Sequence, residues 1–453
     1  MSHATRMSPV VSLHTLGCKA NQYDTERMRQ ELESRGAVTV YDCERAEVAV
    51  VNTCTVTNRA DTDARRLIRR LRRRNPALTI LVAGCSAAVR AADYRAMPEV
   101  DVVVSGHDPD SVADALCETG VGPRGGPRGR AAVLRRSDRG TRAWVKIQTG
   151  CDRRCSFCAT RIARGANRSR PADEIVREAE VLSARHPELV LTGVHIGHYG
   201  RDLPEPVSLG RLCALLLEKV EARIRLTSIE ATEIDDVLVD LLTTSAGRLA
   251  PHLHVPLQSG SDRILRLMRR WHTREAYRRR VWEIADRLPF LGLGADVIVG
   301  FPGEGEEEFS ETRALIRDLP YTYLHVFPYS PRDHTAAAAL PSRVPGDVAA
   351  ARSRELRRLA YRKGMAYRAS RADQLAEIVV EGDAEATSGL SGDYLRVALR
   401  GPGFAPGDRL RAPLRLEGDG LHVRASEAVP IRARPVSRPP GNPPTPGSRP
   451  SSD

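Results

Sequence analysis

Short runs of apolar residues alternate with polar, helix-like segments in the first part of the chain. VVSLHTL, AEVAVVNT, LTILVAG and VDVVVSG have the composition of strands, whereas YDTERMRQELESRG and DTDARRLIRRLRRRNP are helix-like. This alternation predicts a parallel sheet with covering helices over residues 9–120. Ligands of such sheets gather at the carboxyl ends of the strands.

The alternation resumes after residues 121–142, which are rich in Gly, Pro and Arg and are predicted to form a linker or a surface hairpin. Six strand candidates follow within residues 143–371: AWVKIQ, ELVLTG, RIRLTSIE, HLHVPL, LGADVIVG and YLHVFPY. Helix-like segments separate them. Six βα units predict an open, partial barrel, shorter than the closed form of eight units, with its reactive rim at the strand ends.

The pattern changes again after a helical stretch over residues 346–370. AEIVVEGD, YLRVALRG, DRLRAPLRLEGD and LHVRASEAV are short strand candidates with glycine turns, and they predict a small antiparallel barrel over residues 372–432. The tail, residues 433–453, is too rich in Pro and polar residues to pack and is predicted to be disordered. The predicted fold class is therefore α/β, with three domains.

The net charge of the chain indicates a binding partner. The chain of 453 residues has a formal net charge of +12, and all but four of its 69 basic residues are arginines. A coding bias would explain the preference for Arg equally well, but the excess charge favours RNA, because Arg binds phosphate and stacks on bases. The sequence shows no signal-like leader and no run of about 18 apolar residues, so we expect a cytosolic protein without a membrane span.

Six of the nine cysteines form two groups of three. The first triad follows three predicted strand ends of the first domain: Cys18, Cys54 and Cys85. The second triad lies on one loop after the first barrel strand, in CDRRCSFC: Cys151, Cys155 and Cys158. The other three have no partner spacing and are expected to be structural: Cys43, Cys117 and Cys213.

In a reducing compartment, grouped cysteines are more often metal ligands or catalytic groups than disulfides. Three thiolates on one loop can hold three irons of a four-iron cluster and leave the fourth iron open. A zinc site is the alternative for the second triad, but His186 and His195 do not stand at a zinc-ribbon spacing from it.

The C-x3-C-x-aromatic-C motif on a partial βα barrel resembles the radical S-adenosylmethionine enzymes. In that superfamily the open iron chelates the amino and carboxylate groups of S-adenosylmethionine, and one electron cleaves it to methionine and a 5′-deoxyadenosyl radical. The resemblance implies a [4Fe-4S] cluster on the second triad and a place for Phe157 near the adenine.

The resemblance narrows to the methylthiotransferase family. RGANRSRP, LTGVHIGHYG, HVPLQSGSDRILRLM, DVIVGFPGE and HVFPYSP match its barrel motifs in order, and the last domain is similar to its RNA-binding TRAM domain. A second [4Fe-4S] cluster on the first triad is implied, with an open iron that carries the sulfur. Implied partners are tRNA, a sulfur donor and a reductant such as flavodoxin or ferredoxin.

The resemblance also implies cofactor-binding residues at the barrel rim. Thr192 and Gly193 match the family position that meets the methionyl amino group. Ser228 and Glu230 are expected to bind ribose or the same amino group, and Gln258 lies at the end of the HVPL strand. For each of them the alternative is a satisfied polar group at a strand end.

Two polar segments of the first domain have open interpretations. Asn21, Gln22 and Asp24 are expected to hydrogen-bond cluster sulfides or substrate, although Asp24 would also suit a helix cap. RRLIRRLRRR, residues 65–74, carries seven arginines and no acid, and its place after a cluster ligand favours phosphate contact over a merely solvated face.

Three branches of the family differ in substrate. GCKANQYDTE is most similar to the branch that modifies N6-threonylcarbamoyladenosine in tRNA; the isopentenyladenosine branch reads more like GCQMNEYDS and the ribosomal-protein branch like GCPKNLVDSE. The implied reaction places a methylthio group on C2 of the adenine in two stages. The alternatives are the isopentenyladenosine reaction and a non-catalytic RNA-binding metalloprotein. Trp271, Gly305 and Asp333–His334 depart from the pattern of the branch.

Overall fold

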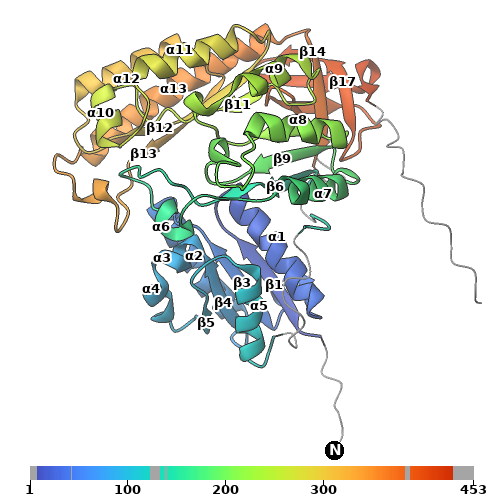
Figure 1. Ribbon diagram of the computed structural model, residues 1–453, viewed down its shortest axis with the longest axis vertical. Coiled ribbons are helices and arrows are strands. Elements are labelled where there is room, and N and C mark those ends of the chain that lie inside the picture. Colours follow the sequence, from blue (N-terminus) through green and yellow to red (C-terminus); the bar gives the residue numbers. More distant parts are fainter. Residues whose placement is uncertain (1–7, 42, 123–132, 138–139, 383–387, 432–453) are drawn as a thin grey trace, which may run out of the picture.

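The computed structural model describes residues 8–41, 43–122, 133–137, 140–382 and 388–431 (Figure 1). The predicted tail and much of the predicted linker lie outside these residues. Within them, no helix is long and apolar enough to cross a bilayer. The strands form three separate regions in chain order: an N-terminal sheet, a pair of barrel sheets and a C-terminal sheet.

The N-terminal region is a five-stranded parallel sheet in the order β2-β1-β3-β4-β5. Its strands are β1 (Val10–Thr15), β2 (Val38–Val40), β3 (Val48–Thr53), β4 (Thr79–Gly84) and β5 (Val102–Val103). Its helices are α1 (Lys19–Ser34), α2 (Asn58–Arg74), α3 (Cys85–Val89), α4 (Ala91–Arg95) and α5 (Pro109–Glu118). The four predicted strands are confirmed; the short β2 was not predicted.

Helices cover both faces of this sheet, which explains why β3 is buried along its whole length. Met28 and Leu32 of α1 pack with Leu116 of α5 on one face. Ile68 of α2 and Tyr94 of α4 pack on the other. The apolar runs of the sequence are therefore continuous because neither side of the sheet meets water.

All six predicted barrel strands are present, but they form two parallel sheets of three strands. The first has the order β10-β9-β6 and the second β11-β12-β13. The strands are β6 (Arg142–Lys146), β9 (Glu188–Thr192), β10 (Arg223–Leu226), β11 (His252–His254), β12 (Gly292–Val299) and β13 (Tyr323–Pro328). Isolated bridges join the two sheets, for example Ser228 with His254. The result is the expected partial barrel.

Helices cover the outside of the barrel (Figure 1). They are α7 (Ala172–Ser183), α8 (Leu209–Lys219), α9 (Asp236–Thr244), α10 (Asp262–Leu267), α11 (Arg274–Ala285), α12 (Glu306–Asp318) and α13 (Gly346–Ser370). The last agrees with the predicted helix. Near the rim lie the hairpin of β7 (Gln148–Thr149) and β8 (Arg168–Ser169), the helix α6 (Thr160–Arg164) and three 3-10 turns, η1 (Ile196–His198), η2 (Ala231–Glu233) and η3 (Ala336–Ala339).

The C-terminal region is a curled seven-stranded sheet in the order β18-β19-β16-β15-β14-β17-β20. The elements are β14 (Leu375–Glu381), β15 (Ser388–Ser391), β16 (Arg396–Arg400), β17 (Arg409–Pro413), β18 (Arg415–Glu417), β19 (Gly420–Arg424), η4 (Ala425–Glu427) and β20 (Val429–Pro430). The predicted small antiparallel domain is confirmed as a curled, mostly antiparallel sheet, in which β16 and β19 run parallel. A tight hairpin between β18 and β19 reverses the chain just before this pairing.

Two buried arginines fasten the C-terminal sheet to the barrel. Arg223 and Arg225 of β10 are fully buried and share the carboxylate of Glu188 on β9. Their remaining N–H groups donate to main-chain oxygens of the C-terminal sheet: those of Glu377, Leu390, Ser391 and Gly392. Burial would raise the pKa of Glu188, but the two guanidiniums hold it well below its usual range. Buried charge is costly unless fully paired, so the joint is rigid only when both sides are in place.

Candidate cluster and cofactor site

The first triad lies at one edge of the N-terminal sheet. Its cysteines follow β1, β3 and β4, which are neighbours in the sheet. Cys18 is exposed, whereas Cys54 and Cys85 are buried. Cys18 is the N-cap residue of α1 and Cys85 is the first residue of α3. Burial raises the pKa of Cys54 and raises the pKa of Cys85 to about 11, so these two thiols are neutral until a metal displaces their protons.

Glycines allow the cysteine-bearing loops to approach one another. Gly17 precedes Cys18 with φ +97°, and a Cβ there would lie 2.5 Å from the sulfur of Cys54. Gly84 precedes Cys85 with φ +94°, and its Cβ would lie 2.3 Å from Oδ1 of Asn52. A side chain at either position would be strained and would also collide, so the sequence Gly-Cys is a geometric requirement of this edge.

Asn21 joins the three loops of the first triad. Its Nδ2 donates to the main-chain oxygens of Leu16 at 2.9 Å and Thr53 at 2.8 Å, and its Oδ1 lies 3.6 Å from Cys85 Sγ. The side chain is fully buried. Asn21 therefore ties together the strand ends that carry the cysteines, and its expected contact with cluster or substrate stays a prediction.

The second triad begins directly after β7. His195 Nδ1 lies 3.4 Å from Cys151 Sγ, and Arg270 Nη1 donates to Cys155 Sγ at 3.7 Å. Burial raises the pKa of Cys151 to about 12. Burial also raises the pKa of Cys155, although the positive charge of Arg270 partly offsets this increase. Thiols of this kind are neutral without metal and release protons when iron binds.

Acidic side chains of the rim balance the cations beside the second triad. Glu230 forms an ion pair with Arg270. Glu233 lies 2.7 Å from His195 Nε2 and 3.0 Å from His198 Nε2. Burial would raise the pKa of Glu233, but these two rings hold it well below its usual range. Sequence reasoning assigned no role to Glu233, Arg270 or His198, although the motif LTGVHIGHYG contains His198.

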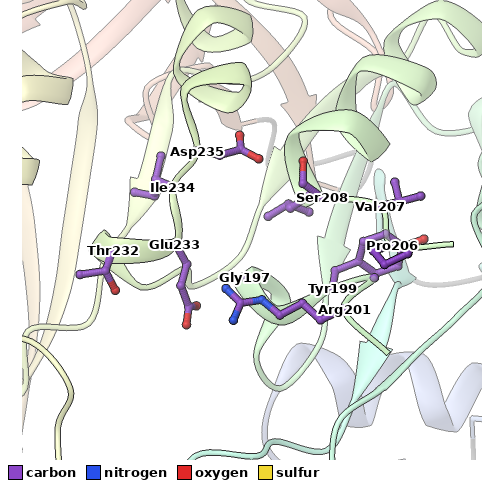
Figure 2. Close-up of a pocket in the computed structure, with 12 residues that line it drawn as sticks. Gly197, Tyr199, Arg201, Pro206, Val207, Ser208, Thr232, Glu233, Ile234 and Asp235 are labelled. Carbon is purple, nitrogen blue, oxygen red and sulfur yellow. The ribbon is translucent and has the colours of Figure 1, made fainter. Parts of the chain in front are cut away.

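Glu233 also forms part of the wall of a pocket of about 450 Å³ beside the rim. Figure 2 shows its carboxylate directed towards the space in which the guanidinium of Arg201 also lies, with Tyr199 and Ser208 on the opposite wall. The pocket is thus formed by the segments that follow β9 and β10.

The structure distributes the six predicted cofactor residues over the rim. Phe157 packs against the cluster that contains Phe301, which belongs to the GFPGE turn. Thr192 ends β9, and its main-chain oxygen accepts from Ile147 N at 2.9 Å. A Cβ on Gly193 would lie 2.7 Å from Oε1 of Gln148. Phe157 thus lies on the loop that bears the second triad, and Thr192 and Gly193 contact residues that precede this loop.

The remaining three lie on the next strands. Ser228 Oγ hydrogen-bonds His254 Nδ1 at 2.8 Å. Glu230 is engaged with Arg270, as described above. Gln258 adopts φ +66°, a left-handed conformation that a residue with a Cβ rarely takes, and bridges to β12. Strain of this kind clusters at ligand sites, and the role of Gln258 in cofactor binding stays a prediction.

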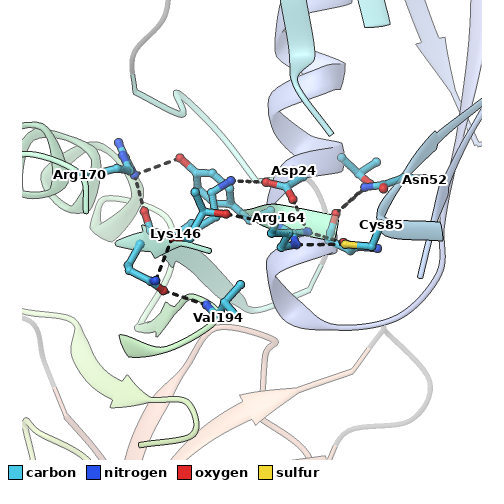
Figure 3. Close-up of polar contacts among 12 residues, drawn as sticks. Asp24, Asn52, Cys85, Lys146, Arg164, Arg170 and Val194 are labelled. Carbon is cyan, nitrogen blue, oxygen red and sulfur yellow. Dashed lines mark hydrogen bonds and ion pairs between the residues drawn. The ribbon is translucent and has the colours of Figure 1, made fainter. Parts of the chain in front are cut away.

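Arg164 joins the segment after the second triad to Cys85 of the first triad (Figure 3). It ends α6, which follows the second triad and contacts α3, the helix that Cys85 begins. Its Nε donates to Cys85 Sγ at 3.0 Å, and its Nη2 donates to Asn21 Oδ1 at 2.5 Å and to Asp24 Oδ2 at 2.7 Å. The RGANRSRP motif contains Arg164, but sequence reasoning assigned it no role.

Asp24 is the counter-ion of this arrangement. It is buried and pairs with Lys146 of β6 as well as with Arg164. Burial would raise its pKa, but these two cations lower it to about 2. The helix-cap alternative for Asp24 is wrong, because α1 begins at Lys19 and Asp24 lies within it. Gln22, in contrast, is exposed.

A second arginine of the barrel region secures the loop after Cys54. Arg332 follows β13, and its Nη2 donates to Thr55 Oγ1 and Asp61 Oδ2, both at 2.6 Å. The side chain is buried. Arg332 and Arg164 therefore hold two of the three cysteine loops against the barrel.

The donor sets fit two iron–sulfur clusters better than zinc. Among the described residues all cysteines are free of disulfides. His186, considered as a zinc ligand, points its Nδ1 at the main-chain oxygen of Thr141, 3.2 Å away. Each triad offers three thiols, and in each an arginine N–H group donates to one sulfur, a contact that cluster thiolates commonly accept.

The chain matches two family descriptions, Uncharacterized protein family UPF0004 over residues 10–105 and Radical SAM superfamily over residues 145–316. A protein of Bacillus subtilis strain 168 named Threonylcarbamoyladenosine tRNA methylthiotransferase MtaB is 37% identical over 411 residues, which cover 86% of this chain and 90% of that protein. A protein of the same name from Aquifex aeolicus is 36% identical and covers 82% of this chain and 93% of its own length.

A protein of Bacillus mycoides named tRNA-2-methylthio-N(6)-dimethylallyladenosine synthase is 33% identical, with 85% of this chain and 78% of that protein covered. Among solved structures, the radical S-adenosylmethionine methyltransferase TsrM from Kitasatospora setae superposes with a TM-score of 0.54. It shares 17% identity over 73% of this chain and 77% of that one, so the likeness concerns the fold alone.

Proposed function

The chain belongs to the tRNA methylthiotransferase family of radical S-adenosylmethionine enzymes, and from this premise we propose that it places a methylthio group on C2 of N6-threonylcarbamoyladenosine at position 37 of tRNA. The observation that carries this proposal is the contact of Arg164 with Cys85. This contact brings the segment that follows the second triad next to the first triad. A reaction that uses both clusters requires the two triads to be close to each other.

The enzyme uses two [4Fe-4S] clusters and S-adenosylmethionine. We assign one cluster to each triad and S-adenosylmethionine to the rim residues beside the second triad. Bound there, these cofactors supply the methyl group, the sulfur and the 5′-deoxyadenosyl radical that an inert aryl C–H bond requires.

The residues of the chain position and balance these groups. Arg164 and Arg270 each direct an N–H group at a cysteine sulfur, which stabilises the thiolate form that binds iron. Glu230 neutralises Arg270 and Asp24 neutralises Arg164, so that both guanidiniums stay buried in one orientation. Buried, paired arginines also keep bulk water away from the space between the triads.

tRNA is the natural partner of the excess positive charge. Exposed arginines lie on α2, beyond the first triad, and on the C-terminal sheet. We assign phosphate contacts to both surfaces, because Arg binds phosphate without regard to base sequence. A reductant such as flavodoxin or ferredoxin and a donor of sulfur complete the set of partners in the proposal.

The experiment that tests the substrate deletes the gene in its host and analyses the nucleosides of bulk tRNA by mass spectrometry. The proposal requires that 2-methylthio-N6-threonylcarbamoyladenosine disappears while its precursor without sulfur accumulates. Wild type on a plasmid should restore the product, and a Cys54→Ala variant should not. Loss of the methylthio derivative of isopentenyladenosine instead, or unchanged tRNA, would assign the chain to another branch.

A further inference from the structure

A cavity of about 280 Å³ opens where the three regions of the chain meet, beside the first triad. We call it the junction cavity. Its walls come from all three regions: Thr15, Gln22 and Glu26 from the N-terminal region, Arg142 and Trp144 from β6, and Glu381 from β14. Gln22 N donates to the main-chain oxygen of Cys18, which places the cavity within one helical turn of a cluster ligand.

Lys19, the residue after Cys18, lies over the ring of Trp144, which forms part of the wall of this cavity. Its Nζ lies 5.5 Å from the centre of the Trp144 ring, and the guanidinium carbon of Arg142 lies 5.6 Å from the same ring. Lys19 is partly buried. Within the part of the chain that the structure describes, no carboxylate comes within ion-pair distance of its ammonium group.

The nearby acids are already paired with arginines. Glu381 accepts from Arg142 Nε at 2.5 Å, and Glu26 lies 3.3 Å from Arg29 Nε. Glu188, the fully buried acid of the barrel interior, is shared by the two arginines of the C-terminal joint. The positive charge of Lys19 is therefore in excess, in a place where water is partly excluded and an anion would be bound strongly.

The chemistry of the substrate places an anion close to this point. C2 and C6 of adenine flank the same ring nitrogen, so a substituent on N6 lies near the carbon that receives the sulfur. The threonylcarbamoyl group ends in a carboxylate. An adenine whose C2 faces the first triad therefore brings that carboxylate to the neighbourhood of Cys18, where Lys19 stands.

We propose that Lys19, supported by Arg142, binds the carboxylate of the N6-threonylcarbamoyl group, and that Trp144 forms the floor of this subsite. The assignment rests on the function proposed above and adds to it the residue that selects an acidic substituent. An apolar isopentenyl group would leave the ammonium group of Lys19 without a partner, at the cost of a desolvated charge.

The test compares two tRNA substrates that differ in one group. One carries N6-threonylcarbamoyladenosine and the other its neutral carboxamide analogue at the same position. Wild type should prefer the acid in kcat/KM by about 10- to 100-fold, the range expected for a hydrogen bond to a charged group. Lys19→Gln should reduce this ratio to near one, because kcat/KM should fall for the acidic substrate and stay unchanged for the carboxamide. Lys19→Arg should retain much of the preference.

Two controls separate this role from structural damage. Lys219→Gln, at an exposed lysine on α8, should leave the preference unchanged, and iron content should remain that of wild type in Lys19→Gln. Should Lys19→Gln fail to load iron, Arg142→Gln tests the same preference from a residue that is not adjacent to a ligand.

Each remaining outcome has a distinct meaning. An equal loss of kcat/KM on both substrates in Lys19→Gln would show that Lys19 only supports the structure of the Cys18 loop. An unchanged preference for the acid would show that Lys19 does not bind the carboxylate. Either result overturns the assignment. A wild-type enzyme that modifies isopentenyladenosine in tRNA and neither of these substrates would overturn the proposed function itself.

Discussion

The Nε of Arg164 donates to the sulfur of Cys85 across 3.0 Å, although the two residues belong to different regions of the chain. Arg164 follows the second triad and Cys85 belongs to the first. Asn21, Asp24 and Thr149 accept from the same guanidinium, so its orientation is fixed by four partners. An N–H group directed at a cluster thiolate raises the reduction potential of that cluster, which makes Arg164 a positioning residue with an electronic effect.

Replacing Arg164 with Gln should therefore lower the potential of the cluster on the first triad. The measurement is an EPR-monitored redox titration in a background in which all three cysteines of the second triad are Ala. We expect a shift of roughly 60 mV, a tenfold change in the ratio of reduced to oxidised cluster. Arg164→Lys should shift it less, and Arg168→Gln, at an exposed neighbour, should not shift it. An unchanged potential in Arg164→Gln would contradict the assigned role.

Gly17 and Gly36 form a matched pair for testing the approach of the cysteine loops. Both have positive φ, +97° and +95°, but only at Gly17 would a Cβ meet another atom, the sulfur of Cys54. Gly17→Ala should abolish the first cluster and leave about half of the iron, whereas Gly36→Ala should keep all of it at a cost of about 1 kcal/mol in stability. The measurement is the iron content of each variant after anaerobic reconstitution. Equal iron content in both variants would contradict the close approach of Gly17 to Cys54.

The two triads should have separable tasks. Cys155→Ala should abolish reductive cleavage of S-adenosylmethionine, because the cluster that binds it is lost. Cys54→Ala should retain cleavage but insert no sulfur, with about four irons left of about eight, as expected for two four-iron clusters. Product analysis by chromatography follows both reactions, and loss of cleavage in both variants would show that the tasks are not divided.

tRNA affinity should depend on exposed arginines of the C-terminal sheet. Removing the whole sheet would uncover Arg223 and Arg225, so point variants are the better test. Arg396→Gln with Arg424→Gln should weaken binding of tRNA and lower the slope of log affinity against log salt by about one for each arginine. Arg279→Gln, on α11, is the control. A slope that does not change would exclude this surface.

Asp24 should contribute to stability in a pH-dependent way. Its pKa of about 2 lies below the ordinary value of 3.8, so the ionised form stabilises the folded chain at neutral pH and this contribution is lost as the pH falls through about 2. Relative to Asp24→Asn, the iron-free wild-type chain should be more stable by about 2 kcal/mol near pH 6, and the difference should shrink below about pH 5 and vanish near pH 1. Denaturant unfolding at a series of pH values measures this; parallel curves would contradict it.

The features that follow from local pattern were predictable from the sequence. Each cysteine of the first triad follows an apolar run, and such runs end at one edge of a parallel sheet, so their convergence could be expected. The helix over residues 346–370 and the six barrel strands follow from periodicity and composition in the same way. The parallel pairing of β16 and β19 depends on a crossing that no local pattern records.

The charged groups that join the regions could not be predicted. In RIRL the arginines alternate with apolar residues, a pattern typical of a strand with one wet face, yet both arginines are buried beneath the C-terminal sheet. The alternation of polar and apolar residues along a strand shows which side chains share a face of the sheet, but it does not show which other element covers that face. For the same reason the contact of Arg164 with Cys85, 79 positions away, left no signal in either segment.

The joint between barrel and C-terminal sheet has a consequence for how this family can be re-engineered. Arg223 and Arg225 donate to main-chain oxygens, which every amino-acid sequence presents when the backbone follows the same path. The joint therefore constrains the backbone path of the C-terminal sheet but hardly constrains its amino-acid sequence. A sheet taken from a relative with another RNA preference should dock on the same two arginines, so that chimeras joined near residue 372 would exchange RNA binding without rebuilding the interface.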